Sequence, residues 1–179
     1  MRGNDLQFEV TGAQQFAQLA RHLKANDRQM KNEMAAAVRK ATKPAVNEVK
    51  AAILAVESHS YGGGRKAREQ YAQARGSKTA SRGLRAAIAR GITARTAMSV
   101  KSAGVRIHVN TTQLPPDQKS LPALMDGGRT WRHPVFGNRE VWVTQQAAPW
   151  FYVTLYKLRD PVAQELLLVV DRFMARISK

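Results

Sequence analysis

The sequence contains no cysteine in its 179 residues. This absence excludes disulfide frameworks, thiolate zinc sites and cysteine nucleophiles together, so the fold has to be stabilised by packing. Long apolar runs are missing as well: the longest near the C-terminal part covers residues 166–170, far below the ~20 residues that a membrane-spanning helix needs. Residues 1–10 lack the apolar core of a secretory signal. We therefore expect a soluble chain that contacts no membrane and works in the compartment where it is made.

Acidic residues are scarce, with 13 Asp and Glu against 29 Lys and Arg, which leaves a formal net charge of +16. Glu33, Glu48 and Glu57 are dispersed on the solvent side of a predicted helix, so they do not indicate a carboxylate pair for acid–base catalysis. The histidines lie one per segment, none at a metal-ligand spacing from another. They are His22, His59, His108 and His133. We predict a non-enzymatic protein with no metal and no cofactor.

The nearest approach to a phosphate-binding loop is Gly-Ser-Lys-Thr at residues 76–79. A P-loop needs a glycine directly before its lysine and a second glycine five residues earlier, after a buried strand. Ser77 and Arg75 interrupt this pattern, so the sequence does not indicate a nucleotide-binding loop.

The N-terminal third predicts one strand and two helices. Apolar and polar residues alternate over residues 6–10, which is typical of a half-buried strand, and helical spacing follows over residues 13–24. Residues 27–58 predict a long amphipathic helix, and Pro44 predicts a kink or break between Ala41 and Ala45. The apolar stripe of this helix consists of Met30, Met34, Val38, Ala41, Ala45, Val49, Ile53 and Val56.

The rest of the chain predicts a short helix at 83–88, strands at 92–100 and 104–110 around a tight turn, and a helical turn at 121–125. A last strand is expected at 140–145, and an amphipathic helix from about Pro161. This order is typical of an α+β fold in a single domain, residues 1–179. We expect a small antiparallel sheet covered by the long, proline-interrupted helix and the C-terminal helix.

A glycine-containing basic loop or insertion is predicted at residues 59–82. Its six basic residues are opposed by one acid, Glu69, and they form the candidate contact with a partner protein or DNA. Tyr61 and Tyr71 are its only aromatics, which gives poor support to stacking on single-stranded nucleic acid. A solvated surface is the alternative interpretation. The basic residues are Arg65, Lys66, Arg68, Arg75, Lys78 and Arg82.

Aromatic residues gather in the C-terminal third, where core packing and subunit contact both stay open as explanations. The candidate subunit contacts are Trp131, His133, Phe136, Trp142 and Trp150.

Three short motifs of this region carry a family resemblance. They are Leu-Pro-Ala-Leu-Met-Asp-Gly-Gly at 121–128, Arg-His-Pro-Val-Phe-Gly-Asn at 132–138 and Trp-Val-Thr-Gln-Gln-Ala-Ala-Pro-Trp-Phe at 142–151, before a closing amphipathic helix. With a Gly-Leu-Arg element at 83–85, the chain resembles the tail-completion, or head-tail connector, proteins of the neck of long-tailed bacteriophages.

The resemblance implies a structural virion protein, assembled in the host cytoplasm. It implies a homo-oligomeric ring, expected to be a hexamer, at the head-proximal end of the tail. Its partners would be copies of itself and the tail terminator, tail tube or head connector, with genomic DNA in the channel as an open alternative for the basic loop. A sequence-independent DNA-binding protein is the alternative function, because the charge alone would then be the working feature.

Overall fold

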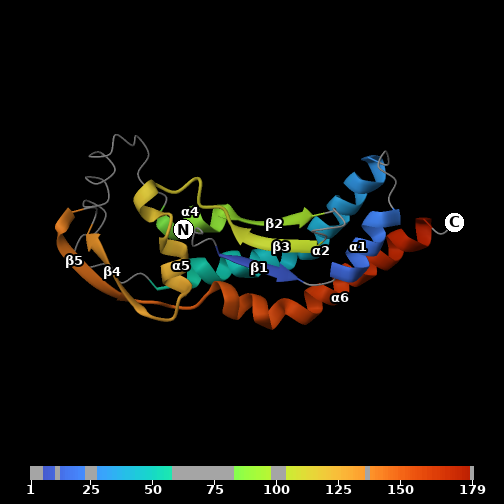
Figure 1. Cartoon of the computed structure of the whole chain (residues 1–179). Coiled ribbons are helices and arrows are strands. Elements are labelled where there is room, and N and C mark those ends of the chain that lie inside the picture. The colour runs from blue at the N-terminus through green and yellow to red at the C-terminus, as the bar shows by residue number, and fades with distance from the viewer. Residues whose placement is uncertain are drawn as a thin grey trace.

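The computed structural model describes residues 6–10, 13–22, 28–57, 83–97, 104–135 and 138–177 (Figure 1). Within these ranges the α+β prediction is confirmed, since the chain forms five helices, an antiparallel sheet of three strands and a second sheet of two strands. The predicted basic loop lies outside the described residues. In the described part, every helix is either too short or too polar to pass through a bilayer.

The three-stranded sheet is built from β1 (Gln7–Val10), β2 (Ile92–Ala97) and β3 (Gly104–Val109), in the antiparallel order β1-β3-β2. These are the strands that the period-two alternation predicts. Val105, Ile107 and Val109 are buried on one face of the central strand, and Arg106 is exposed on the other. One face of the sheet therefore belongs to the core and the other faces outward.

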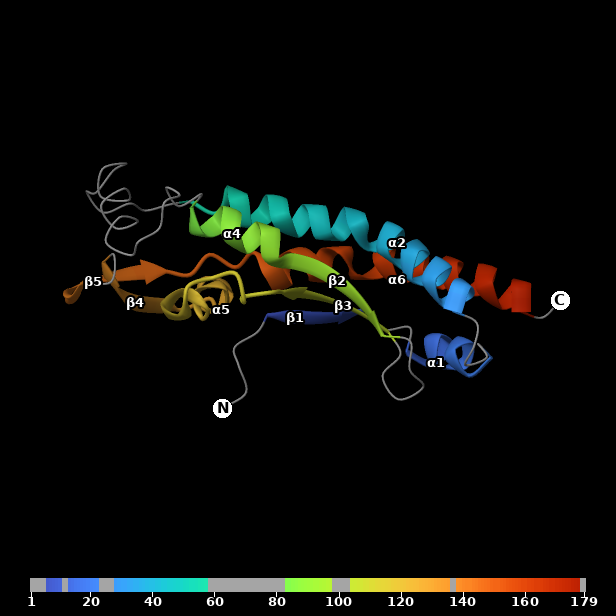
Figure 2. The ribbon, with the colours of Figure 1, turned by 90° about the horizontal axis from the view of Figure 1, so that it is seen from above.

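Two long helices cover the inner face of this sheet and pack on one another: α2 (Arg28–Ala55) and α6 (Phe151–Ile177). α2 lies against β2 and α6 against β1, while α1 (Ala13–His22) packs on α6 at one end of the molecule (Figure 2). The hydrophobic core lies between these helices and the sheet. Its fully buried members include Leu19, Met34, Val38, Val49, Ile53, Ile88, Ile92, Ile107, Phe151 and Val170.

Of the kink or break predicted between Ala41 and Ala45, the break is wrong, because α2 is continuous through Pro44. The apolar stripe itself is confirmed, with Thr42 added to it as a buried polar residue. The Thr42 hydroxyl donates to the Val38 carbonyl at 2.9 Å, which satisfies the hydroxyl inside the helix. Pro44 lies on the exposed side, where water can solvate the carbonyl that lacks its usual donor.

α6 begins at Phe151, ten residues before the predicted start at Pro161, which lies inside the helix instead. Pro161 is exposed, so its missing N–H again falls on the solvent side. The amphipathic character predicted for this helix is confirmed, since its buried residues run from Val162 to Phe173, and this buried side extends back to Leu155 and Phe151.

α4 (Leu84–Gly91) leads directly into β2 and packs on α2. The Asn110 N–H donates to the Gly91 carbonyl at 2.8 Å, which ties the end of α4 to the end of β3. A Cβ at position 91 would lie 2.4 Å from the Asn110 carbonyl oxygen, so this close approach requires glycine. A short 3-10 turn (Pro116–Gln118) and α5 (Leu121–Asp126) follow the sheet.

The second sheet is a hairpin of β4 (Thr130–Val135) and β5 (Asn138–Gln146). The strand predicted at 140–145 is confirmed within β5. β4 was not predicted, and the hairpin forms a second sheet beside the small antiparallel sheet that was expected. Pro134 lies within β4, opposite Trp142, and the register shifts between Pro134 and Val135. In a two-stranded sheet both strands are edges, so a proline can turn its missing donor away from the ladder.

Candidate functional site

The hairpin forms one end of an elongated molecule, beyond α5 and the start of α6 (Figure 1). In the described part of the chain its two strands contact each other far more than they contact any other element. A two-stranded hairpin is marginally stable in water by itself. Among the described elements, the hairpin is therefore held mainly by the pairing of its own two strands.

Among the aromatic side chains described in this hairpin, Trp142 is the exposed one, with 48% of its surface accessible. Arg132 and Trp142 are diagonal neighbours across the two strands, and the Arg132 guanidinium carbon lies 5.9 Å from the centroid of the indole ring. A guanidinium at this distance from a tryptophan face makes a cation–π interaction. The pair presents a large, partly rigid aromatic surface next to a positive charge, a combination typical of protein interfaces.

Two other predicted contact residues, Trp131 and Trp150, are buried in their own chain, with 9% and 2% of their surfaces accessible. The Trp150 ring packs edge-to-face on Phe151 at 5.5 Å between ring centroids. Of the two explanations left open for the aromatic block, core packing holds for Trp150, because its side chain has almost no surface left for another subunit. Trp131 is similarly enclosed.

The remaining predicted site residues are described incompletely. His133 lies in β4 in register with Val143, and Phe136 lies outside the described residues. The basic-loop residues Arg65, Lys66, Arg68, Arg75, Lys78 and Arg82 also lie outside them.

Asp126, at the end of α5, is a buried carboxylate that the sequence did not single out, with 7% of its surface accessible. Its Oδ1 accepts hydrogen bonds from the backbone N–H groups of Trp150 at 2.7 Å and Phe151 at 2.6 Å. Its Oδ2 accepts from the Tyr152 N–H at 3.4 Å. The first N–H groups of a helix have no partner within the helix, so Asp126 acts as an N-cap supplied from another element.

This cap joins two of the motifs that carry the family resemblance. Asp126 belongs to the first motif, residues 121–128, and Trp150 and Phe151 end the third, residues 142–151. The negative carboxylate also lies where the dipole of α6 is positive, which adds to the hydrogen bonds. The motifs therefore build a junction between the hairpin and the two-helix layer, and this role is structural.

A second group of exposed aromatic residues lies where α6 passes β1. Tyr156 is 65% accessible and packs edge-to-face on Phe8 at 5.4 Å between ring centroids. The Tyr152 hydroxyl donates to the Gln7 carbonyl at 3.3 Å, at the edge of the sheet that β3 does not occupy. Sequence reasoning missed this group because residues 151–160 were not predicted as helix.

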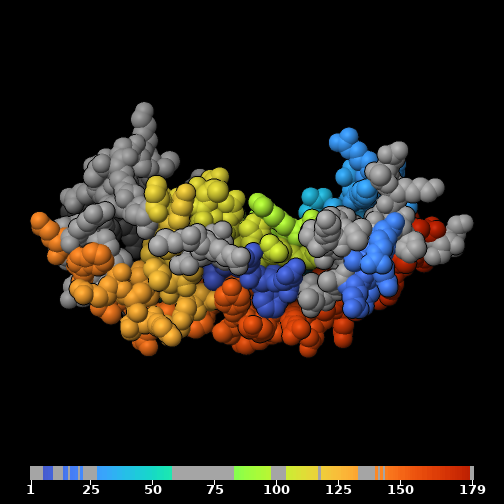
Figure 3. All heavy atoms as spheres, in the orientation of Figure 1, coloured from blue at the N-terminus to red at the C-terminus, as the bar shows by residue number. Residues whose placement is uncertain are grey.

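Positive charge is concentrated on the outward face of the three-stranded sheet. Arg95 and Arg106 are directly opposite each other on β2 and β3, and both are exposed. Like charges in this position destabilise a sheet, and the one acidic neighbour described here, Glu9, has its Oε1 3.9 Å from the Arg106 Nη2. This outward face lies on the surface seen in Figure 3, between the hairpin end and the α1 end.

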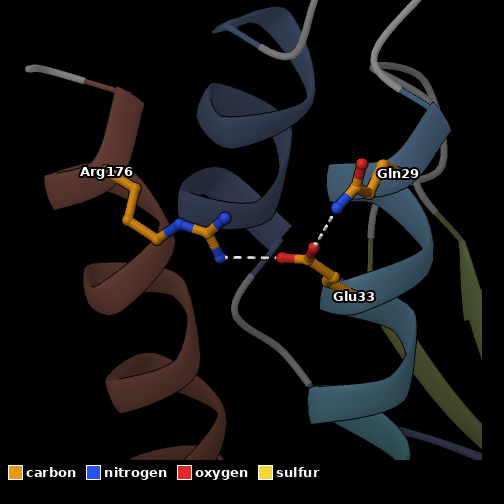
Figure 4. Close-up of polar contacts among 3 residues, drawn as sticks. All are labelled: Gln29, Glu33 and Arg176. Atoms are coloured by element: carbon orange, nitrogen blue, oxygen red, sulfur yellow. Dashed lines mark hydrogen bonds and ion pairs between the residues drawn. The ribbon is translucent and has the colours of Figure 1, made fainter.

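At the far end, α2 and α6 are joined by a polar bridge (Figure 4). Arg176 Nη1 donates to Glu33 Oε2 at 2.9 Å, and Gln29 Nε2 donates to Glu33 Oε1 at 3.1 Å. The hydrogen bond from Arg176 and then that from Gln29 hold the pKa of the Glu33 carboxyl below its ordinary value. This arrangement fastens the two helices and has no evident catalytic geometry.

Among the described residues, no three His, Cys, Asp or Glu side chains gather in a way that could hold a metal ion. Comparison of the chain with models of protein families, with curated proteins and with solved structures finds no match. The candidate functional features are therefore surfaces: the Arg132–Trp142 hairpin, the Tyr152–Tyr156 group and the exposed basic residues.

Proposed function

We propose that this chain is a structural subunit of a phage neck, forming an oligomeric ring at the head-proximal end of a long tail. The support for the phage neck is the resemblance carried by residues 121–128, 132–138 and 142–151. In this proposal the protein joins layers of a particle and converts no substrate.

The observation that carries the subunit role is the exposed Trp142 on a hairpin that projects from the core (Figure 1). A two-stranded hairpin with an exposed indole is stabilised when another surface covers it. A neighbouring subunit supplies such a surface repeatedly in a ring, where the tip of one copy meets a different face of the next. The elongated outline of the molecule, with the hairpin at one tip and α1 at the other, suits this head-to-tail arrangement (Figure 3).

Charge sets a condition on this assembly. Copies of a chain with a net charge of +16 repel one another at close range, so a ring requires counter-charge from an adjoining layer or from DNA. An acidic tail terminator, tail tube or head connector, or the genome in the channel, would provide it.

The test uses tails assembled without this chain, mixed with the purified protein and imaged by electron microscopy. We expect a closed ring, hexameric by the family resemblance, to appear at the head-proximal end of the tail. Tails that stay unchanged, together with a protein that stays monomeric at all accessible concentrations, would rule the proposal out.

A further inference from the structure

Four basic residues of α2 are here called the basic stripe: Arg39, Lys40 and Lys43, which are exposed, and Lys50, which is half-buried. Arg39, Lys43 and Lys50 are separated by four and seven residues, which places them on one side of a helix, and Lys40 lies beside them. No acidic residue occurs between positions 34 and 47. The stripe therefore forms a line of positive charge along the middle of the longest helix.

Within the described residues, no acidic side chain forms an ion pair with the basic stripe. Glu33 is engaged by Arg176, and Glu48 lies on roughly the opposite side of α2 from Lys43 and Lys50, as helical spacing requires. Arg39 and Lys43 repel each other at the i,i+4 spacing, which destabilises a helix slightly. The stripe thus lacks counter-charge in the described part of its own chain.

The basic stripe points away from the core. The residues that α2 buries, among them Met34, Val38 and Val49, lie on the side that meets the sheet and α6. Figure 2 shows α2 along one long edge of the molecule, as the outermost of the described elements there. A ligand can therefore approach the stripe without any rearrangement of the fold.

The composition of the stripe favours duplex DNA over other polyanions. Protein interfaces are depleted in lysine and enriched in aromatic residues, whereas three of the four stripe residues are lysines and none is aromatic. Stacking on single strands needs aromatic side chains, which the stripe lacks. From Arg39 to Lys50 the helix rises ~16 Å, which matches about five phosphates along one strand of a duplex.

We infer that the basic stripe of α2 binds the phosphate backbone of duplex DNA without reading its sequence. Lysine ammonium groups contact phosphates as point charges, and the counterions they release drive the binding. This inference does not depend on the phage-neck proposal, since it holds equally for a free DNA-binding protein.

The experiment measures the affinity of the purified full chain for a labelled random-sequence duplex over a range of salt concentrations. The stripe variant carries Lys40→Gln, Lys43→Gln and Lys50→Gln. The control variant carries Lys119→Gln, Lys157→Gln and Arg159→Gln, which remove the same charge at exposed positions elsewhere. Glutamine keeps the helix propensity of lysine, so both variants should melt like the parent chain.

We expect the slope of log K against the logarithm of the salt concentration to become less steep by roughly two to three in the stripe variant, since each lost phosphate contact removes about 0.9 from that slope. At about 0.1 M salt its affinity for the duplex should fall at least tenfold, while the control variant falls much less. The parent chain should also prefer the duplex to a single strand of equal length and to polyglutamate of equal charge.

Equal losses in the two variants would overturn the inference, because they would reflect net charge alone. An unchanged stripe variant or a parent chain that does not bind the duplex would do the same. Tighter binding of polyglutamate would assign the stripe to an acidic protein, and tighter binding of the single strand would exclude duplex recognition.

Discussion

Asp126 acts on backbone groups that lie 24 to 26 residues later in the chain. Because the carboxylate and the N–H groups of Trp150 and Phe151 are buried, water cannot replace the lost hydrogen bonds when the side chain is removed. This single residue therefore fixes where α6 begins and how the hairpin meets the helices.

For Asp126→Ala we expect the free energy of unfolding to fall by about 2–3 kcal/mol, since a cap is lost and buried donors are left unpaired. Asp126→Asn should lower the free energy of unfolding by less, because the asparagine amide oxygen can still accept hydrogen bonds from the same N–H groups. Chemical denaturation measures both. Asp160→Ala, at an exposed position of α6, is the control and should change stability by less than about 0.5 kcal/mol; an equal loss there would contradict the role given to Asp126.

The Glu33–Arg176 bridge makes a pH-dependent contribution to stability. The pKa of Glu33 is lowered in the folded protein, so the ionised carboxyl stabilises the fold above its ordinary pKa. That contribution is lost as the pH falls below 4.5 and through the lower folded pKa. Glu33→Gln should therefore lower the melting temperature by roughly 1–3 °C at pH 7 and by less at acidic pH, as calorimetry can follow.

Glu165 provides the matched control, because it is an exposed glutamate on α6, the helix that also carries Arg176. The difference in melting temperature between Glu165→Gln and the parent chain should not become smaller at acidic pH. If the Glu33→Gln difference stays constant from neutral to acidic pH, the bridge does not stabilise the fold through its charge.

At the scale of elements, the helices and strands that could be predicted are those whose sequence pattern lies within the element itself. The alternation of Val105, Ile107 and Val109 and the stripe of α2 were both confirmed, because burial repeats with the period of the element. The start of α6 was missed because its cap is supplied by Asp126, which no local pattern connects to Phe151. β4 was missed because Pro134 argues against a strand unless its free edge is known.

For the candidate site as well, the features that depend on distant parts of the chain could not be predicted. The sequence could not show that Trp142 is exposed and Trp150 buried. Both indoles lie in one aromatic block, and only the fold decides which of them is covered. Tyr152 and Tyr156 could be recognised as an exposed group only once the structure showed that α6 begins at Phe151.

Pro44 offers a test at the level of a whole helix. Pro44→Ala restores the backbone donor for the Lys40 carbonyl, so we expect the free energy of unfolding to rise by about 1–2 kcal/mol. Pro149→Ala, outside the helices, is the comparison and should bring no gain. Thermal denaturation distinguishes the two, and a loss of stability in Pro44→Ala would mean that packing of α2 depends on the proline.

At the scale of the whole molecule, the two tryptophans separate assembly from folding. Trp142→Ala should leave the unfolding free energy within about 1 kcal/mol of the parent and abolish self-association in sedimentation velocity, since the indole is exposed on the hairpin. Trp150→Ala should cost about 3–5 kcal/mol, because it empties the core beside Phe151. Self-association that survives Trp142→Ala would count against the hairpin as the contact surface.

The sheet order β1-β3-β2 also governs when the chain can fold during its synthesis. Residues 7–10 pair with residues 105–108, so β1 has to wait for about a hundred further residues before its partner β3 leaves the ribosome. The layer of α2 and α6 closes later still, after residue 151. Pairings so distant along the chain slow folding. The apolar faces of α2 and of the sheet therefore stay uncovered until translation has passed α6, and a message cut short before that point yields no closed core.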